Sequence, residues 1–211
     1  MVVANPLVTR AGRKSLLLAA LTVAYTLSFA DRQVLSLLVE PIKRDLHITD
    51  VQASLLQGLA FSLIYASAGI PIGLLADRLS RRNIVLLGVS VWSLMTMLCG
   101  FAGSFGQLFV GRFGVGIGEA ALLPAAYSML ADSYAPDRLP RATSVFALGP
   151  AIGTGCAYIL GSGVLSRLDE SGPVPLGPLG VVRPWQAVFL LVGALGVVAI
   201  LMLAYVREPG R

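Results

Sequence analysis

Six long apolar stretches, separated by short polar segments, constrain this sequence more than any other feature. They run over about Ser15–Leu38, Val51–Leu75, Asn83–Ala102, Leu108–Ala131, Ala142–Leu165 and Trp185–Val206. About 20 mostly apolar residues are enough for a helix to cross the hydrocarbon core of a bilayer. Charged residues make up only 13% of the chain, whereas soluble domains carry roughly a quarter. The sequence therefore predicts an all-α integral membrane protein with six transmembrane helices.

The distribution of lysine and arginine predicts the orientation in the membrane. With the N-terminus in the cytoplasm, ten of the 16 basic residues fall on the inside and four on the outside, as the positive-inside rule requires. Both termini are therefore expected to be cytoplasmic, in a multi-pass protein of the cell membrane. The expected organisation is a tail over residues 1–14, a bundle over 15–206 with an irregular external loop at 166–183, and the start of a cytoplasmic linker at 207–211.

Several other functional classes are disfavoured. The net charge of +5 comes from interhelical loops rather than one basic face, so we expect no nucleic-acid binding. Cys99 and Cys156 show no metal-ligand spacing, and His47 is alone in a polar loop, so neither a metal nor an intramembrane enzyme is expected. No nucleotide-binding loop is visible, and no cofactor is predicted. The N-terminal basic residues and apolar run also resemble a signal peptide, which the five later stretches make the weaker interpretation.

The connection between the second and third stretches carries the most specific motif. It reads GLLADRLSRR from Gly73 to Arg82. This resembles the signature loop of the major facilitator superfamily, with Ser80 where the family usually has glycine. The residues that the motif predicts to act as a conformational latch are Gly73, Asp77, Arg78, Arg81 and Arg82, with Asp132 as a partner for one of the arginines. Gly73 is expected to allow close approach of helices, and Asp77 to face a helix N-terminus in a second bundle.

Further motifs extend the resemblance over nearly the whole chain. The run RFGVGIGE from Arg112 to Glu119 resembles the family pattern of the fourth helix, and its continuation resembles the Spinster-like branch. The run GPAIGTG, which begins at Gly149, resembles the Gly-Pro motif of the fifth helix. The residues expected to serve helix packing are Gly116, Gly149, Pro150 and Gly153. The resemblance implies one six-helix bundle of the superfamily, built as a 3+3 inverted repeat.

Four ionisable residues lie within the apolar stretches, where charge is costly and is by default a sign of function. They are Asp31, Arg32, Arg112 and Glu119. Helical spacing places Asp31 and Arg112 toward the outer side, as expected partners, and Glu119 near the midplane. We expect Glu119 to be the first candidate for carrying a coupled proton, Asp31 the second, and Arg112 their counter-charge. A static ion pair is the alternative interpretation.

The predicted function is that of a secondary transporter that moves a small organic or amphiphilic solute by alternating access. A substrate with an anionic head would suit Arg112 or Arg32. The expected partners are the substrate, a coupling proton, the lipid bilayer and a second, C-terminal six-helix bundle, which makes the chain a fragment. A half-transporter that pairs with itself, and a receptor or structural protein without transport, are the alternatives.

Overall fold

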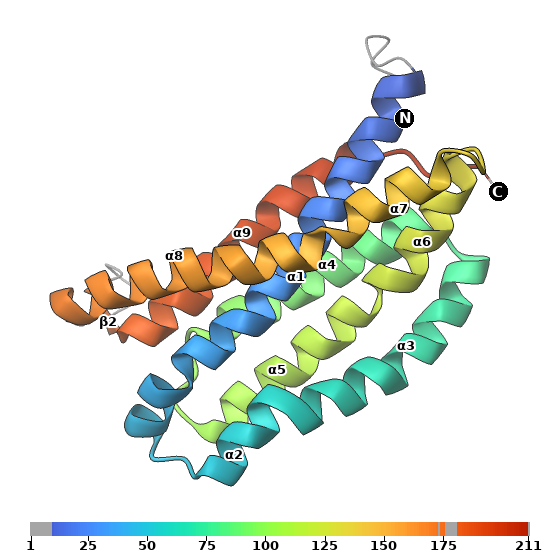
Figure 1. Ribbon diagram of the computed structural model, residues 1–211. Coiled ribbons are helices and arrows are strands. Elements are labelled where there is room, and N and C mark those ends of the chain that lie inside the picture. Colours follow the sequence, from blue (N-terminus) through green and yellow to red (C-terminus); the bar gives the residue numbers. More distant parts are fainter. Residues whose placement is uncertain (1–9, 173, 176–180, 211) are drawn as a thin grey trace.

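The computed structural model is almost entirely helical over the residues it describes, which are 10–172, 174–175 and 181–210. Its elements are α1 (Arg10–Leu46), α2 (Asp50–Ser54), the π-helix η1 (Leu55–Leu59), α3 (Ala60–Arg78), α4 (Arg81–Cys99), α5 (Phe105–Ala120), α6 (Leu122–Ser133), α7 (Leu139–Ala147), α8 (Gly149–Ser171), β1 (Val174–Pro175), β2 (Val181–Val182) and α9 (Pro184–Tyr205). The helices run back and forth, and both ends of the described chain lie at the same end of the bundle (Figure 1).

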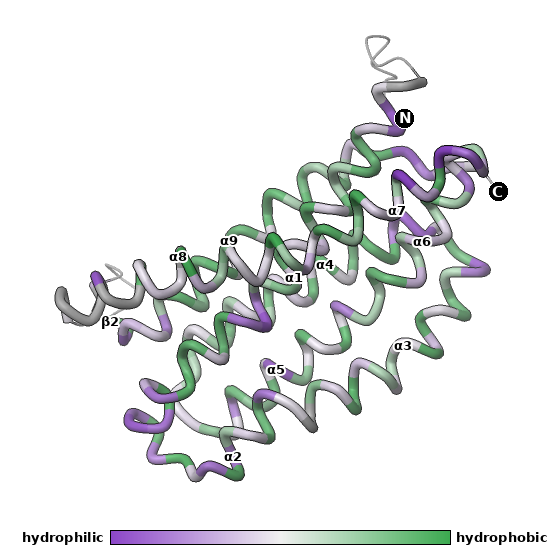
Figure 2. The backbone as a smooth tube through the Cα atoms, viewed as in Figure 1, coloured by the Kyte–Doolittle hydropathy of each residue, from purple (hydrophilic) through white to green (hydrophobic). Residues whose placement is uncertain are grey.

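Each predicted stretch overlaps one pass of the chain through this bundle. Five passes are long and apolar enough to cross a membrane, and they cover Asp50–Arg78, Arg81–Cys99, Phe105–Ser133, Leu139–Val164 and Pro184–Tyr205. The first pass, α1, spans 37 residues but is not among the five. Its apolar run is interrupted by Asp31 and Arg32, which find partners inside the bundle. Hydrophobic residues dominate along the helices and hydrophilic ones at their ends (Figure 2).

Two of the passes are each divided into two helices, and a proline explains each division. Pro124 has no N–H to donate to the carbonyl of Ala120, where α5 ends. Pro150 likewise cannot donate to the carbonyl of Phe146, one residue before the end of α7. A proline in the first turn of the following helix therefore separates α5 from α6 and α7 from α8.

Helices α1 and α4 occupy the centre of the bundle. Helix α1 packs on α8 and α9, and α4 packs on α9 and α5, whereas α3 contacts the bundle mainly through α5 and lies at one edge (Figure 1). The approach of α8 to α1 depends on glycine: a Cβ at Gly153 would overlap the carbonyl oxygen of Thr26, and one at Gly149 would lie 3.2 Å from the Tyr25 side chain. The predicted packing of these two glycines is present, and Pro150 stands beside them in the first turn of α8.

Two expectations about local structure are wrong. The segment 166–183 is not simply an irregular loop, because α8 continues to Ser171 and β1 pairs with β2 in an antiparallel ladder. Helix α8 ends where Gly172 adopts a positive φ of 71°, a conformation that glycine reaches at little cost. Gly73 marks no close helix contact within the described residues, since a Cβ there would meet no atom within 4 Å.

Candidate functional site

The first element of the candidate site is a buried ion pair between α1 and α5. Nη1 of Arg112 donates to Oδ2 of Asp31 over 2.7 Å, and the two side chains are 3% and 2% exposed. The hydroxyl of Thr96 on α4 donates to the other carboxylate oxygen, Oδ1, over 2.8 Å. The predicted partnership of Asp31 and Arg112 is thus present. The Asp31 carboxylate thus links α1 to two other helices, because α4 binds one of its oxygens and α5 binds the other.

A second ion pair joins the same two helices through the neighbouring residue of α1. Nε of Arg32 donates to Oε2 of Glu119 over 2.6 Å, and the side chains are 26% and 0% exposed. Adjacent residues on a helix point about 100° apart, so Asp31 and Arg32 reach two different residues of α5. Arg112 and Glu119 are seven residues apart on α5, which places them on one face. The four predicted residues therefore form two pairs in parallel.

Aromatic rings surround the guanidinium of Arg32. Its Cζ lies 4.9 Å from the ring centre of Phe29, 4.8 Å from that of Phe61 and 4.9 Å from that of Tyr65. Rings at this distance attract a cation through their negative faces. These rings are not evident as site residues from the sequence, because an aromatic residue in an apolar stretch looks like core or lipid-facing packing. Gly116, which was also predicted to serve helix packing, lies against Phe61. A Cβ added at this glycine would lie 3.4 Å from the Phe61 ring.

Two polar atoms of the ion pairs have no hydrogen-bond partner among the described residues. They are Oε1 of Glu119 and Nε of Arg112, and both are buried. Buried polar atoms of this kind usually have a partner, so each exception calls for an explanation. The Glu119 oxygen can accept a proton or a donor, and the Arg112 nitrogen can donate to an acceptor.

A second ionic cluster lies at the end of the bundle that carries both chain ends. Arg81, at the start of α4, pairs with Asp132 of α6 and donates from Nε to Oε1 of Glu208 over 3.0 Å. Its Nη1 also donates to the hydroxyl of Ser128 over 2.8 Å. The predicted pairing of Asp132 with one of the motif arginines is present, with Arg81 as the arginine. Glu208 was missed, because it lies 127 residues away along the chain.

Ser80 and Arg82 complete this cluster. Ser80 caps α4, where its hydroxyl accepts from the backbone N–H of Asn83, and it donates to Oε2 of Glu208 over 2.9 Å. Arg82 donates to the carbonyls of Leu203 and Ala204 at the end of α9, where a cation complements the helix dipole. The serine that departs from the family motif therefore binds the segment after α9. No ion pair of the described residues includes Asp77 or Arg78, and both are exposed.

The cluster favours the charged form of Glu208. Partial burial alone raises the pKa of this carboxyl, but the backbone N–H of Arg82, the guanidinium of Arg81 and the hydroxyl of Ser80 outweigh it, so the pKa lies below its ordinary value. Over the described residues, no group of three or more His, Cys, Asp and Glu side chains is arranged to hold a metal.

Comparison with known proteins identifies the family. The sequence profile described as Major Facilitator Superfamily matches residues 21–211. An MFS-type efflux pump of Mycolicibacterium smegmatis is 33% identical over 87% of this chain and 40% of its own length. Human protein spinster homolog 1 is 31% identical over 95% of this chain and 36% of its own length.

Solved structures agree with the sequence relatives. A bacterial homologue of the human lysosomal transporter Spinster, in an inward-facing and unoccupied conformation, has a TM-score of 0.85 and 37% identity over 99% of this chain and 45% of its own. The occupied form of such a homologue has a TM-score of 0.84. The chain spans less than half the length of these relatives. Family profile, relatives and fold lead to one conclusion: the chain belongs to the Major Facilitator Superfamily and is similar to its Spinster proteins.

Proposed function

We propose that this chain forms the N-terminal six-helix bundle of a secondary transporter, with α1 as the sixth span and with a C-terminal bundle as its partner. The two halves would rock around a central site and expose it to each side in turn. Membership of a transporter family supports this proposal and disfavours a receptor without transport.

The observation that carries the proposal is the pair of parallel ion pairs, Arg32–Glu119 and Asp31–Arg112. Ionised side chains are expensive within a membrane bundle, and they usually mark an ion or substrate pathway. A purely structural pair has no need of a free carboxylate oxygen and a free guanidinium nitrogen, which Glu119 and Arg112 both leave in the described part of the chain.

Glu119 is the proposed carrier of a coupled proton. One of its oxygens binds Arg32 and the other has no partner in the described structure, so a proton added there would weaken the bond to Arg32. The released guanidinium would keep its position among the rings of Phe29, Phe61 and Tyr65. Asp31 is the second candidate, because both of its oxygens already accept a hydrogen bond, one from Arg112 and one from Thr96.

The solute we propose is a small organic or amphiphilic molecule with an anionic head. Arg32 is the one member of the two pairs with a substantially exposed side chain, at 26%. An anion that binds it would compete with Glu119 for the same guanidinium. This competition would couple binding of the solute to the protonation of Glu119.

We further propose that the protein lies in the cell membrane. The start of α1 and the end of α9 would then both lie on the cytoplasmic side. The excess of basic residues at the end with Arg81 and Arg82 supports this orientation. The Arg81 cluster would then act as a cytoplasmic latch, which we propose favours the outward-open state.

Proton-driven uptake by the full-length protein in liposomes tests the coupling. Glu119→Gln retains the shape of the side chain and removes its charge. We expect this variant to lose transport driven by a pH gradient and to keep exchange of labelled for unlabelled solute. Glu40→Gln is the matched control, because Glu40 lies on α1 with a 64% exposed side chain. Gradient-driven transport by Glu119→Gln at the control rate would exclude Glu119 as the carrier.

A further inference from the structure

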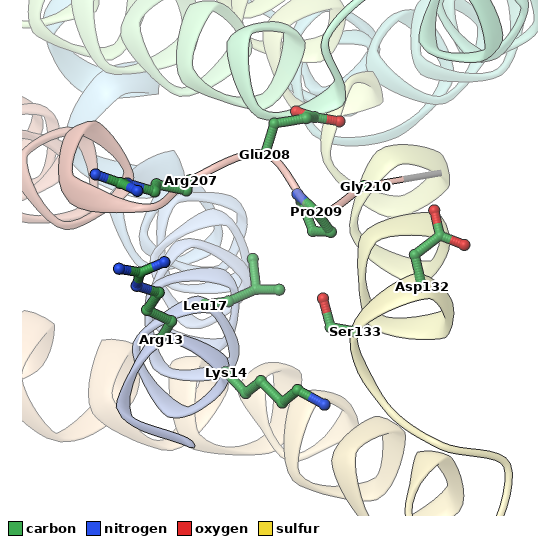
Figure 3. Close-up of a pocket in the computed structure, with 9 residues that line it drawn as sticks. All are labelled: Arg13, Lys14, Leu17, Asp132, Ser133, Arg207, Glu208, Pro209 and Gly210. Carbon is green, nitrogen blue, oxygen red and sulfur yellow. The ribbon is translucent and has the colours of Figure 1, made fainter. Parts of the chain in front are cut away.

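A cavity of about 470 Å³ opens where α1 begins, α6 ends and the chain leaves α9. Its basic lining residues are Arg13, Lys14 and Arg207, and Asp132 and Glu208 are its acidic ones. Figure 3 shows Arg13 and Arg207 on one side of Leu17, with the ammonium of Lys14 on the side of Ser133. Two segments that are far apart in sequence, the start of α1 and the chain after α9, thus contribute cations to one space. From this arrangement we infer that the cavity binds the phosphate headgroup of an anionic phospholipid.

The charge balance of the cavity supports an anionic ligand. Asp132 and Glu208 share Arg81, so one of their two negative charges is compensated. Arg13, Lys14 and Arg207 then bring three positive charges against one remaining negative charge, which leaves the cavity with an excess of positive charge. No ion pair within the described residues includes Arg13, Lys14 or Arg207. Like charges repel when they converge on one space, and an anion between them removes the repulsion.

Contacts with other helices hold one of the three cations and the backbone beside another. Lys14 is placed by the hydroxyl of Tyr134, which donates to the Lys14 carbonyl over 3.0 Å, and by the Tyr134 ring, 5.8 Å below its Nζ. The segment with Arg207 is held by Arg81, whose Nη2 donates to the Pro209 carbonyl over 3.2 Å. A site that is partly held in place in advance loses less conformational entropy when it binds a ligand.

The surroundings of the cavity favour a lipid over a free anion. Leu17 gives the cavity an apolar wall. On α9, Leu201 and Tyr205 are 56% and 78% exposed, and they lie one helical turn apart just before Arg207. A tyrosine at a helix end is typical of the membrane interface, and basic pockets between helices at this level suit anionic headgroups. Acyl chains would lie along this face of α9 while the phosphate reaches the cations.

The test compares two matched double variants of the full-length protein purified in detergent. Arg13→Gln/Arg207→Gln removes two cavity cations. The control, Arg138→Gln/Arg141→Gln, removes two exposed cations, one just before α7 and one within it. Dioleoylphosphatidylglycerol is titrated and bound lipid is counted by native mass spectrometry. We expect affinity to fall roughly 25-fold in the cavity variant, since each basic residue near an anionic surface contributes about fivefold, and to stay nearly unchanged in the control.

Three further arms make the result decisive. Arg13→Lys/Arg207→Lys keeps the charges and should restore most of the affinity. Dioleoylphosphatidylcholine should bind weakly to all variants, and sodium phosphate should displace the anionic lipid only at far higher concentration. Equal losses in the cavity and control variants would overturn the site, because the binding would then follow overall charge. Displacement by phosphate at the lipid's own affinity would overturn the lipid and leave a free anion as the ligand.

Discussion

The interior ion pairs and the cluster around Arg81 both compensate charged side chains, but they differ in how many partners and how much solvent each charge has. In the interior, each carboxylate faces one arginine, and three of the four side chains are at most 3% exposed. In the cluster, one buried arginine serves two carboxylates that are 34% and 31% exposed. Water can replace a lost partner in the cluster but not in the interior. The interior pairs are therefore suited to an all-or-none response, and the cluster to a graded one.

The largest effect should follow removal of an interior partner. Arg112→Gln leaves the Asp31 carboxylate charged, buried and bonded only by Thr96. Breaking a buried pair in this way costs about 3–5 kcal/mol, which SDS unfolding of the detergent-solubilised protein measures. The double variant Asp31→Asn/Arg112→Gln should regain most of the loss. A cost of the single variant below about 1 kcal/mol would show that water reaches this pair and would erase the contrast with the cluster.

A smaller loss is expected when the cluster loses its central arginine. Arg81→Gln removes the shared partner of Asp132 and Glu208, and both carboxylates can then turn to solvent. The expected cost is about 1.5–3 kcal/mol, the range for hydrogen bonds to charged groups, in the same unfolding assay. An equal or larger loss than that of Arg112→Gln would mean that the cluster is no more tolerant than the interior.

Asp77→Asn tests whether the exposed part of the motif acts on conformation rather than on stability. Asp77 has no ion pair in the described residues, so unfolding should change by less than about 0.5 kcal/mol. If Asp77 faces a helix N-terminus of a second bundle, the loss of its charge should move the population several-fold toward inward-open forms. Labelling of cysteines placed on both sides measures this shift. Unchanged labelling on both sides would remove Asp77 from the latch.

The smallest effect concerns the pH dependence of the cluster. The pKa of Glu208 is lowered in the folded protein, so its contribution is present above its unfolded pKa of about 4.3 and is lost as the pH falls through the folded value. We expect less than about 1 kcal/mol, given its partial exposure. Unfolding measured from pH 7 down to about pH 3 should show this loss. Glu208→Gln should flatten that part of the curve, while Glu40→Gln leaves it unchanged.

The apolar stretches and the partner of Asp31 were accessible to sequence reasoning for a physical reason. Hydrophobic length locates a span, helical rise gives the depth of a charge, and charges of opposite sign at one depth attract. Asp31 and Arg112 are therefore predicted as partners without any homologous structure. Asp132 is likewise predicted as a partner for one of the arginines just before the third stretch, since both lie on the same side of the membrane in the predicted topology.

The remaining contacts depend on rotation of the helices, which hydrophobic length does not specify. Arg32 reaches Glu119 across 87 residues, and its ring cage comes from α1 and α3. Glu208 looked like a linker residue because nothing near it in sequence needs a carboxylate. Gly73 was expected to pack because small residues in spans often do, yet α3 lies at the edge of the bundle, where few helices contact it.

Helix α1 can work as a lever, since its interior proline, Pro41, lies close to one end. Its 37 residues give it a length of about 55 Å, and both of its ends are tied to other helices. Near one end, Tyr134 binds the Lys14 carbonyl, and near the other, the indole of Trp185 donates to Asp45 over 2.6 Å. If the bundle tilts as one body about its middle, a rotation of about 10° would carry each end of such a rod roughly 5 Å. The ion pairs near its middle would hardly move, so gates at the two surfaces could open and close around an undisturbed pivot.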